Sequence, residues 1–174
     1  MHTLLRTTAI LALLLTTTSM ALAQGPAGGR GRGRGGPPPE PGLMTYELAA
    51  KAMAAAEAYT RDKGWSMTIR IVDQNNNVVM VHRLNDVNPM TATIAERKTL
   101  TVIGSKMTSA EYGVKVKSGE TAAIENAVTF GGGVPVFLGG RLIGAIAASG
   151  GAPAEDEEVA KAGVAAIGGS TSMK

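Results

Sequence analysis

Hydrophobic and polar residues follow two different periods along the chain, and each period predicts a different kind of element. The Ala-rich segment after Thr45 repeats apolar residues every three or four positions, which predicts a helix capped by Thr45 and ending near Gly64. Residues 67–72 are a short β-branched run, residues 73–77 are rich in Asp and Asn, and residues 78–84 are again apolar. This order predicts a β-hairpin with a polar turn.

The pattern continues with clear helix and turn signals. Pro89 is typical of a helix start, and three consecutive glycines at residues 131–133 interrupt the chain before the next apolar run. Gly139-Gly140 can adopt the positive φ angles of a two-residue hairpin turn. The sequence predicts, in order, a helix from Pro89 to about Met107, a shorter helix over 118–128, strands over 134–138 and 141–148, and a last helix over 155–167.

The predicted strands show little of the alternation that a half-exposed sheet requires. Residues 78–84 and 142–148 are largely apolar at both odd and even positions, so helices are expected to cover both faces of the sheet. The two hairpins make that sheet mainly antiparallel. The fold class predicted for residues 43–174 is therefore α/β, a three-layer α/β/α sandwich of ordinary domain size.

Residues 1–23 have the pattern of a secretory signal peptide. Arg6 lies in a short basic segment, residues 9–15 are apolar, and Ala21-Leu22-Ala23 is a small-x-small cleavage sequence. The apolar run is much shorter than the roughly 20 residues of a membrane-spanning helix. We therefore expect export to the periplasm or the medium, with no transmembrane segment after cleavage. An uncleaved membrane anchor is the alternative.

Residues 24–42 are rich in Gly, Pro and Arg, a composition typical of a disordered linker. Arg-Gly repeats also occur in arms that bind single-stranded nucleic acid, but export would separate the chain from that ligand. The arginines at 6, 30, 32 and 34, together with Glu40, account for the formal net charge of +3. The remaining domain is neutral, and we expect no nucleic-acid partner.

Composition and missing motifs exclude several function classes. The chain has no cysteine, which excludes disulfide scaffolds, thiolate zinc sites, iron–sulfur clusters and cysteine nucleophiles. No Walker loop, Rossmann fingerprint, HExxH motif or nucleophile elbow is present. Signal cleavage would remove His2, so imidazole chemistry in the mature chain depends on His82.

Several ordered motifs resemble the GlcG/HbpS family. Residues 131–163, GGGVPVFLGGRLIGAIAASGGAPAEDEEVAKAG, are similar to its Gly-rich entry, Gly-Ala-Ile core, Ser-Gly-Gly turn and acidic helix start. Residues 71–84 resemble its VVDxxG hairpin, and residues 94–99 resemble its IAxxKAxTA helix. Asn76-Asn77 replaces the usual Gly-His at the hairpin turn, and Asn85-Asp86 replaces Asp-Gly after the strand. The C-terminal domain of PduO-type proteins is similar as well.

This resemblance implies an α/β/α domain that forms homo-oligomers and, in some members, binds or degrades haem. Such relatives include secreted haem-binding sensors and small domains associated with glycolate and diol metabolism. Fold transfers better than function across such a family, because one fold can carry several activities. The alanine- and methionine-rich helices of this neutral domain also favour self-association.

The candidate cofactor-binding residues are His82, Arg83 and Lys98. Imidazole is a good ligand for haem iron, so His82 is also the candidate metal ligand, and an adjacent arginine can pair with a haem propionate. Lys98 could add a second cation. The alternatives are a structural or surface histidine and a solvated helix lysine. Other side chains able to ligate iron are Met67, Met80, Met90, Met107, Tyr46, Tyr59 and Tyr112.

Two further segments have an ordinary structural interpretation and a functional alternative. The acidic run at residues 155–158 suits the first turn of a helix and is expected to be solvated, with a hard-cation site as the alternative. The glycines at residues 131–133 are expected to reverse the chain direction. Their alternative is a contact between backbone N–H groups and an anion.

Three functions therefore stay open. The favoured one is an exported haem-binding protein that senses, scavenges or slowly degrades haem. The second is an enzyme or metabolic accessory protein acting on a small organic acid, with Arg83 and Lys98 binding its carboxylate. The third is an oligomeric interaction module without a cofactor. Haem titration separates the first from the others, and saturable binding of an acid favours the second.

The signal pattern generates a direct prediction about processing. Cleavage is expected after Ala23, because the Ala-Leu-Ala sequence follows the apolar segment at the spacing that signal peptidases require. N-terminal sequencing of protein recovered from the periplasm or medium checks the cleavage point. Product that stays in the cytoplasm and keeps residues 1–23 would contradict it.

Overall fold

The structure is a computed structural model that describes residues 43–173, so the expected signal peptide and linker lie outside the described residues. None of the helices in this range has the length and hydrophobicity needed to cross a membrane. The elements are helix α1 (Tyr46–Asp62), strands β1 (Thr68–Asp73) and β2 (Val78–Arg83), helices α2 (Met90–Ser105) and α3 (Ser109–Ser118), strands β3 (Gly133–Leu138) and β4 (Arg141–Ser149), and helix α4 (Pro153–Ala166).

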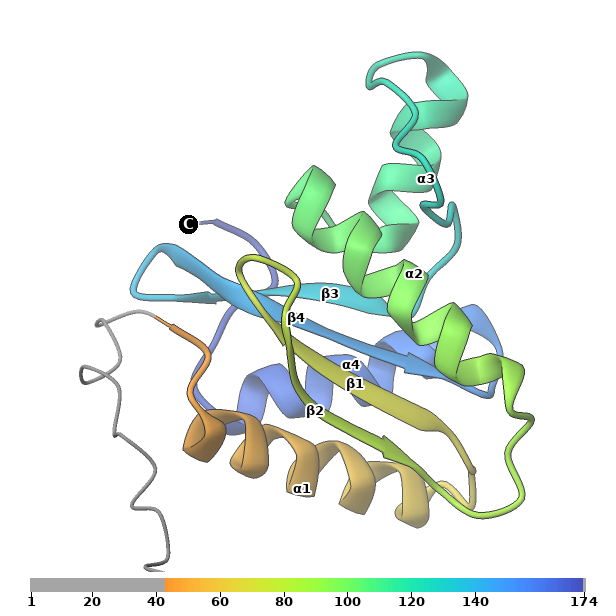
Figure 1. The fold of residues 1–174 in the computed structure, drawn as a ribbon, viewed down its shortest axis with the longest axis vertical. Helices are drawn as coiled ribbons and strands as arrows, with labels where there is room; N and C mark the ends of the chain where they lie inside the picture. Colours follow the sequence, from red (N-terminus) through yellow and green to blue (C-terminus); the bar gives the residue numbers. More distant parts are fainter. Residues whose placement is uncertain (1–42, 174) are drawn as a thin grey trace, which may run out of the picture. The chain divides into compact units, whose positions relative to one another are not determined.

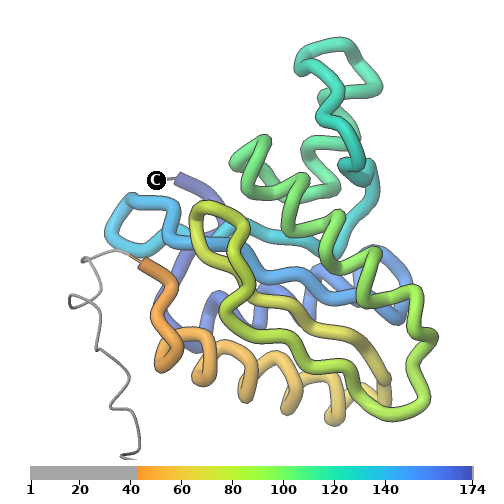
Figure 2. The backbone as a smooth tube through the Cα atoms, in the orientation of Figure 1, coloured from red at the N-terminus to blue at the C-terminus, as the bar shows by residue number. Residues whose placement is uncertain are grey.

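The four strands form one antiparallel sheet in the order β2-β1-β4-β3. Helices α1 and α4 pack against each other on one face of the sheet, and α2 crosses the other face (Figure 1). The backbone trace shows the same three layers, with the β1–β2 hairpin at one edge (Figure 2). The predicted α/β/α sandwich with a mainly antiparallel sheet is confirmed.

Side chains of β1 alternate between the two layers. Ile69 and Ile71 join the main core with α1 and α4, whereas Val72 packs with Val102 of α2 in a smaller cluster. The Thr68 hydroxyl oxygen also faces α2, where it lies 2.7 Å from the hydroxyl oxygen of Thr91. We call these two sides of the sheet the α1 face and the α2 face.

The register of the hairpin assigns the side chains of β2 to these faces. Directly opposite residues of an antiparallel pair project to the same side, and successive residues of a strand project to opposite sides. The paired positions are Ile69 with His82, Thr68 with Arg83, and Arg70 with Val81. The first pair therefore belongs to the α1 face and the other two belong to the α2 face.

The short helix predicted over 118–128 is wrong. The helix in this region is α3, which Thr108 caps by accepting a hydrogen bond from the backbone N–H of Glu111 at 3.1 Å. It ends at Ser118, where Gly119 adopts a φ of +79°. The Ser-Gly-Glu sequence resembled a helix start, but a glycine with positive φ is typical of a helix end.

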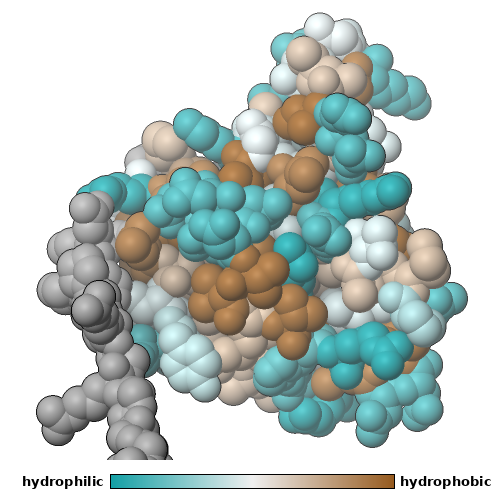
Figure 3. Space-filling model, in the orientation of Figure 1, coloured by the Kyte–Doolittle hydropathy of each residue, from teal (hydrophilic) through white to brown (hydrophobic). Residues whose placement is uncertain are grey.

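The expectation that both faces of every strand are covered is correct for β4 and wrong for β2. Residues 143–149 of β4 are buried, whereas β2 lies at the sheet edge with Val78 and Val81 53% and 40% exposed. Helix α2 packs mainly against β1, β3 and β4. Figure 3 shows the result, a hydrophobic patch in the middle of this side of the molecule, over β2.

Candidate functional site

His82 is held at the edge of the sheet by a carboxylate of α1. Its Nδ1 atom is hydrogen-bonded to Glu57, and the imidazole is 48% exposed. Arg61 donates a second hydrogen bond to Glu57 at 2.7 Å. The hydrogen bond from His82 is the main cause that lowers the pKa of the Glu57 carboxyl below its usual value. This hydrogen bond favours the ionised form of the Glu57 carboxyl and fixes the orientation of the ring.

A surface pocket of about 230 Å³ lies beside His82. With Nδ1 engaged by Glu57, the second ring nitrogen, Nε2, has no hydrogen-bond partner within residues 43–173. A carboxylate on one nitrogen and a ligand on the other is the usual arrangement of metal-binding histidines, because the carboxylate sets the tautomer and raises the basicity of the ring. The residues that line the pocket are Tyr46, Ala50, Met53, Ala54, Glu57, Met80 and His82.

Arg83 does not share this pocket. It is exposed and, as the partner of Thr68 in the register, it belongs to the α2 face, whereas His82 belongs to the α1 face. The sequence analysis predicted that His82 and Arg83 contribute to one site. The strand that carries them sends their side chains in opposite directions.

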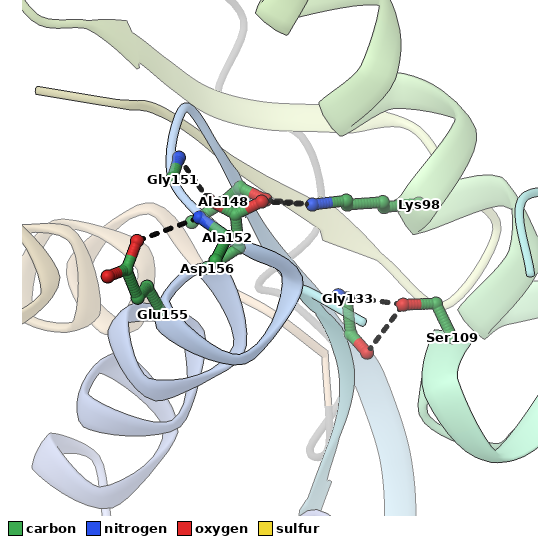
Figure 4. A network of polar contacts seen from close by, with 8 residues as sticks. All are labelled: Lys98, Ser109, Gly133, Ala148, Gly151, Ala152, Glu155 and Asp156. Atoms are coloured by element: carbon green, nitrogen blue, oxygen red, sulfur yellow. Dashed lines mark hydrogen bonds and ion pairs between the residues drawn. The ribbon is translucent and has the colours of Figure 1, made fainter. Parts of the chain in front are cut away.

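Lys98 is fully buried and lies in a third place. Its ammonium donates hydrogen bonds to Asp156 Oδ2 at 2.6 Å and to the Ala148 carbonyl at 2.8 Å, and it lies 5.4 Å from the centre of the Phe130 ring. Asp156 also accepts a hydrogen bond from the Gly151 N–H at 2.9 Å (Figure 4). Lys98 is therefore neither a solvated helix lysine nor a neighbour of Arg83 at the mouth of a pocket.

Burial and pairing act in opposite directions on this ion pair. Loss of water is the largest effect on both groups: it lowers the pKa of Lys98 and raises the pKa of Asp156. The short hydrogen bond between them opposes both shifts. Asp156 also lies in the first turn of α4, where the helix dipole favours a negative charge. The pair joins α2 to the start of α4.

The glycine run at residues 131–133 makes space for this pair. Gly132 has a φ of +115°, and a Cβ atom there would lie 2.2 Å from Lys98 Nζ and 2.7 Å from Asp156 Cβ. A Cβ atom at Gly133 would lie 3.0 Å from the Lys98 carbonyl oxygen. The run thus permits a close approach of the backbone to a buried lysine.

Each carboxylate of the acidic run at residues 155–158 has a hydrogen-bond or ion-pair partner in the described part of the chain. Glu155 accepts a hydrogen bond from the Ala152 N–H at 2.7 Å, Glu157 pairs with Lys161 at 2.7 Å, and Glu158 accepts from the Tyr59 hydroxyl at 2.8 Å. Asp156 is buried, which corrects the expectation of a wholly solvated run. Within the described part of the chain, no group of three or more His, Cys, Asp or Glu side chains could hold a metal ion.

Comparison with known proteins gives the family. The model of the family described as "Haem degrading protein HbpS-like" matches residues 44–165. The chain belongs to this family. GlcG of Escherichia coli strain K12 is 29% identical over 109 residues, which cover 62% of this chain and 81% of GlcG.

Two solved structures extend the comparison to three dimensions. The crystal structure of a PduOC:heme complex has a TM-score of 0.68 and 26% identity, and the match covers 74% of this chain and 98% of that one. A double mutant of HbpS from Streptomyces reticuli has a TM-score of 0.66 and 27% identity, covering 71% of this chain and 86% of that one. The resemblance seen in the sequence motifs is confirmed.

The buried ion pair predicts a strong dependence of stability on Lys98. The substitution Lys98→Met is expected to lower the free energy of unfolding by about 3–5 kcal/mol, because it leaves the Asp156 carboxylate buried without its partner. The double variant Lys98→Met/Asp156→Asn removes both charges and keeps an acceptor for the Gly151 N–H. Urea denaturation should show the double variant clearly more stable than the single one, and equal or lower stability would contradict this account.

The space that Gly132 leaves for the ion pair predicts that alanine costs more stability there than at Gly139, another glycine with positive φ. Gly139→Ala is expected to cost about 1–2 kcal/mol, the strain of a left-handed backbone with a Cβ atom, since nothing lies within 4 Å of that position. Gly132→Ala should cost about 1–3 kcal/mol more, because its Cβ atom also collides with the ion pair. Thermal unfolding of the two variants measures the difference, and equal costs would show that the space at Gly132 is unimportant.

Proposed function

We propose that the mature protein binds haem outside the cytoplasm, with the His82 imidazole as the iron ligand and Glu57 as the residue that positions it. The observation that carries this proposal is the hydrogen bond between His82 Nδ1 and Glu57, which leaves Nε2 available beside a pocket. The family and its relative in complex with heme support the same ligand. Haem bound there would supply an iron centre capable of redox chemistry.

The walls of the pocket suit one part of a porphyrin. Met53, Met80, Ala50 and Ala54 offer apolar contacts, and the Tyr46 side chain, which is 66% exposed, can lie against a flat ring. The pocket volume of about 230 Å³ is smaller than the roughly 300–1,000 Å³ of sites that enclose a whole ligand. A haem held by His82 would therefore be enclosed by these residues only in part.

The location and assembly of the protein are part of the same proposal. The signal pattern of residues 1–23 supports an exported protein that senses, scavenges or degrades haem in the periplasm or the medium. The exposed Val78 at the start of β2 supports a homo-oligomer, because this apolar side chain would otherwise remain in contact with water at a sheet edge.

A titration of the mature protein with hemin tests the proposal. We expect a shifted Soret band for the unaltered protein and loss of that shift, with at least tenfold weaker binding, for His82→Ala. Glu57→Gln should keep coordination but weaken binding by about 10–100-fold, the usual effect of removing a partner that orients a ligand.

The control is Met90→Ala, which removes an exposed thioether outside the pocket. Its hemin titration should match that of the unaltered protein. A Soret band and affinity unchanged by His82→Ala would overturn the assignment of His82, and a spectrum of free hemin with every form of the protein would overturn haem binding altogether.

A further inference from the structure

Arg70 is a mostly buried arginine whose charge is poorly paired. Its side chain is 14% exposed, and its Nε atom is buried without a hydrogen-bond partner among the described residues. The nearest carboxylate, on Glu96 of α2, lies 3.9 Å from the Arg70 guanidinium. That distance exceeds the roughly 2.7–3.2 Å of a hydrogen bond, and the Glu96 side chain is itself 58% exposed. Buried donors of this kind normally have a partner.

A second arginine lies close to Arg70 on the same face of the sheet. Arg70 of β1 is opposite Val81 of β2, and Arg83 is two residues further along β2. Such diagonal neighbours are separated by about 7–8 Å at the backbone, which long side chains can span. Arg83 is exposed, and it has no ion pair in the described part of the chain.

The surface around the two arginines is open. Helix α2 packs mainly on the other three strands, so β2 is left uncovered on this side. Val81, which is opposite Arg70 and two residues before Arg83, is 40% exposed. Thr68 and Thr91 pair through their hydroxyls at the base of the same face. A ligand can therefore approach the exposed Arg83 and the 14% of the Arg70 side chain that faces solvent, and the apolar Val81 lies beside both.

We propose that Arg70 and Arg83 form a carboxylate-binding site on the α2 face of the β1–β2 hairpin. Guanidinium groups bind carboxylates through two parallel N–H···O bonds, which would satisfy the buried donor of Arg70. Two guanidinium groups at diagonal positions suit a small dicarboxylate better than a single carboxylate. This site is on the opposite face of the strand from the His82 pocket.

Glu96 is the internal competitor for this site. Its carboxylate is the only one within 4 Å of either arginine among residues 43–173, and its exposed side chain can move away when a ligand carboxylate arrives. Neutralising it should therefore strengthen ligand binding, whereas removing a guanidinium should weaken it. These opposite effects distinguish a ligand site from a purely structural pairing of Arg70.

The test is a calorimetric titration of the mature protein with succinate and with acetate at low salt. We expect saturable binding of succinate, at least tenfold tighter than acetate. Arg83→Ala and Arg70→Met should each weaken succinate binding at least tenfold, and Glu96→Gln should tighten it several-fold. Arg83→Ala removes an exposed side chain and Glu96→Gln is isosteric, so both keep the test valid if Arg70→Met fails to fold.

The matched control is Arg141→Ala, which removes an exposed strand arginine outside the proposed site and should leave succinate binding unchanged. Equal weakening of succinate binding by the Arg83 and Arg141 substitutions would overturn the proposal. Absence of saturable succinate binding would overturn it as well if Arg83→Ala also leaves the affinity for hemin unchanged.

The carboxylate could belong to a free organic acid or to a haem propionate, and hemin titrations separate these sources. For a free acid, Arg83→Ala leaves hemin affinity unchanged and His82→Ala leaves succinate affinity unchanged. For a propionate, Arg83→Ala weakens hemin at least tenfold, and the dimethyl ester of haem binds the unaltered protein as weakly as hemin binds the variant. Both results support the site. If Arg83→Ala weakens the binding of neither succinate nor hemin, the site is contradicted, whatever His82→Ala does to the Soret band.

Discussion

The buried ion pair between Lys98 and Asp156 fixes how the two helical layers meet at one end of the sheet. Lys98 belongs to α2 on one face, and Asp156 belongs to the first turn of α4 on the other, so the pair connects layers that the sheet otherwise separates. A buried pair of this kind contributes little net energy compared with a well-packed apolar core, but one unpaired charge is very costly. Every polar atom of the pair therefore needs a partner in the right position. Gly132 leaves the space for the ammonium, and the Ala148 carbonyl and Gly151 N–H satisfy the remaining bonds.

The ion pair and the edge strand β2 differ in how they are covered. The two charged groups of the ion pair are enclosed by the glycine run, by β4 and by the start of α4. The edge strand β2 has no such cover, and its Val78, Val81, His82 and Arg83 side chains are exposed. Alternation along this one strand then produces two different chemical environments. The α1 face has an oriented imidazole beside apolar residues, and the α2 face has guanidinium groups with little negative charge near them.

Local patterns in the sequence predicted most of the elements because the forces that determine them act within a few residues. The Thr45 cap, the Asp-Asn turn after β1 and the Gly139-Gly140 turn are all of this kind. The error at residues 118–128 arose where the local signal was ambiguous, since Gly119 can follow one helix or precede another. Partners distant in sequence were not predictable: Glu57 is 25 residues from His82, and Asp156 is 58 residues from Lys98. The family motif marked Lys98 as a residue of interest without indicating that it is buried.

Arg70 shows why a single sequence hides such a site. In the pattern of β1 it is one polar residue among apolar ones, and alternation alone assigns it to a solvated face. A ligand can reach Arg70 only because α2 covers the sheet as far as β1 and leaves β2 open. The position of α2 follows from its packing against β4 and β3 rather than from any residue near Arg70. Arg70 is mostly buried with its Nε atom unpaired among the described residues, and Arg83 adds a second charge two residues along the neighbouring strand. Three separate elements must be in place before a carboxylate site exists. The sequence pattern identifies the two charged residues, but only the arrangement of α2, β1 and β2 brings them to one surface.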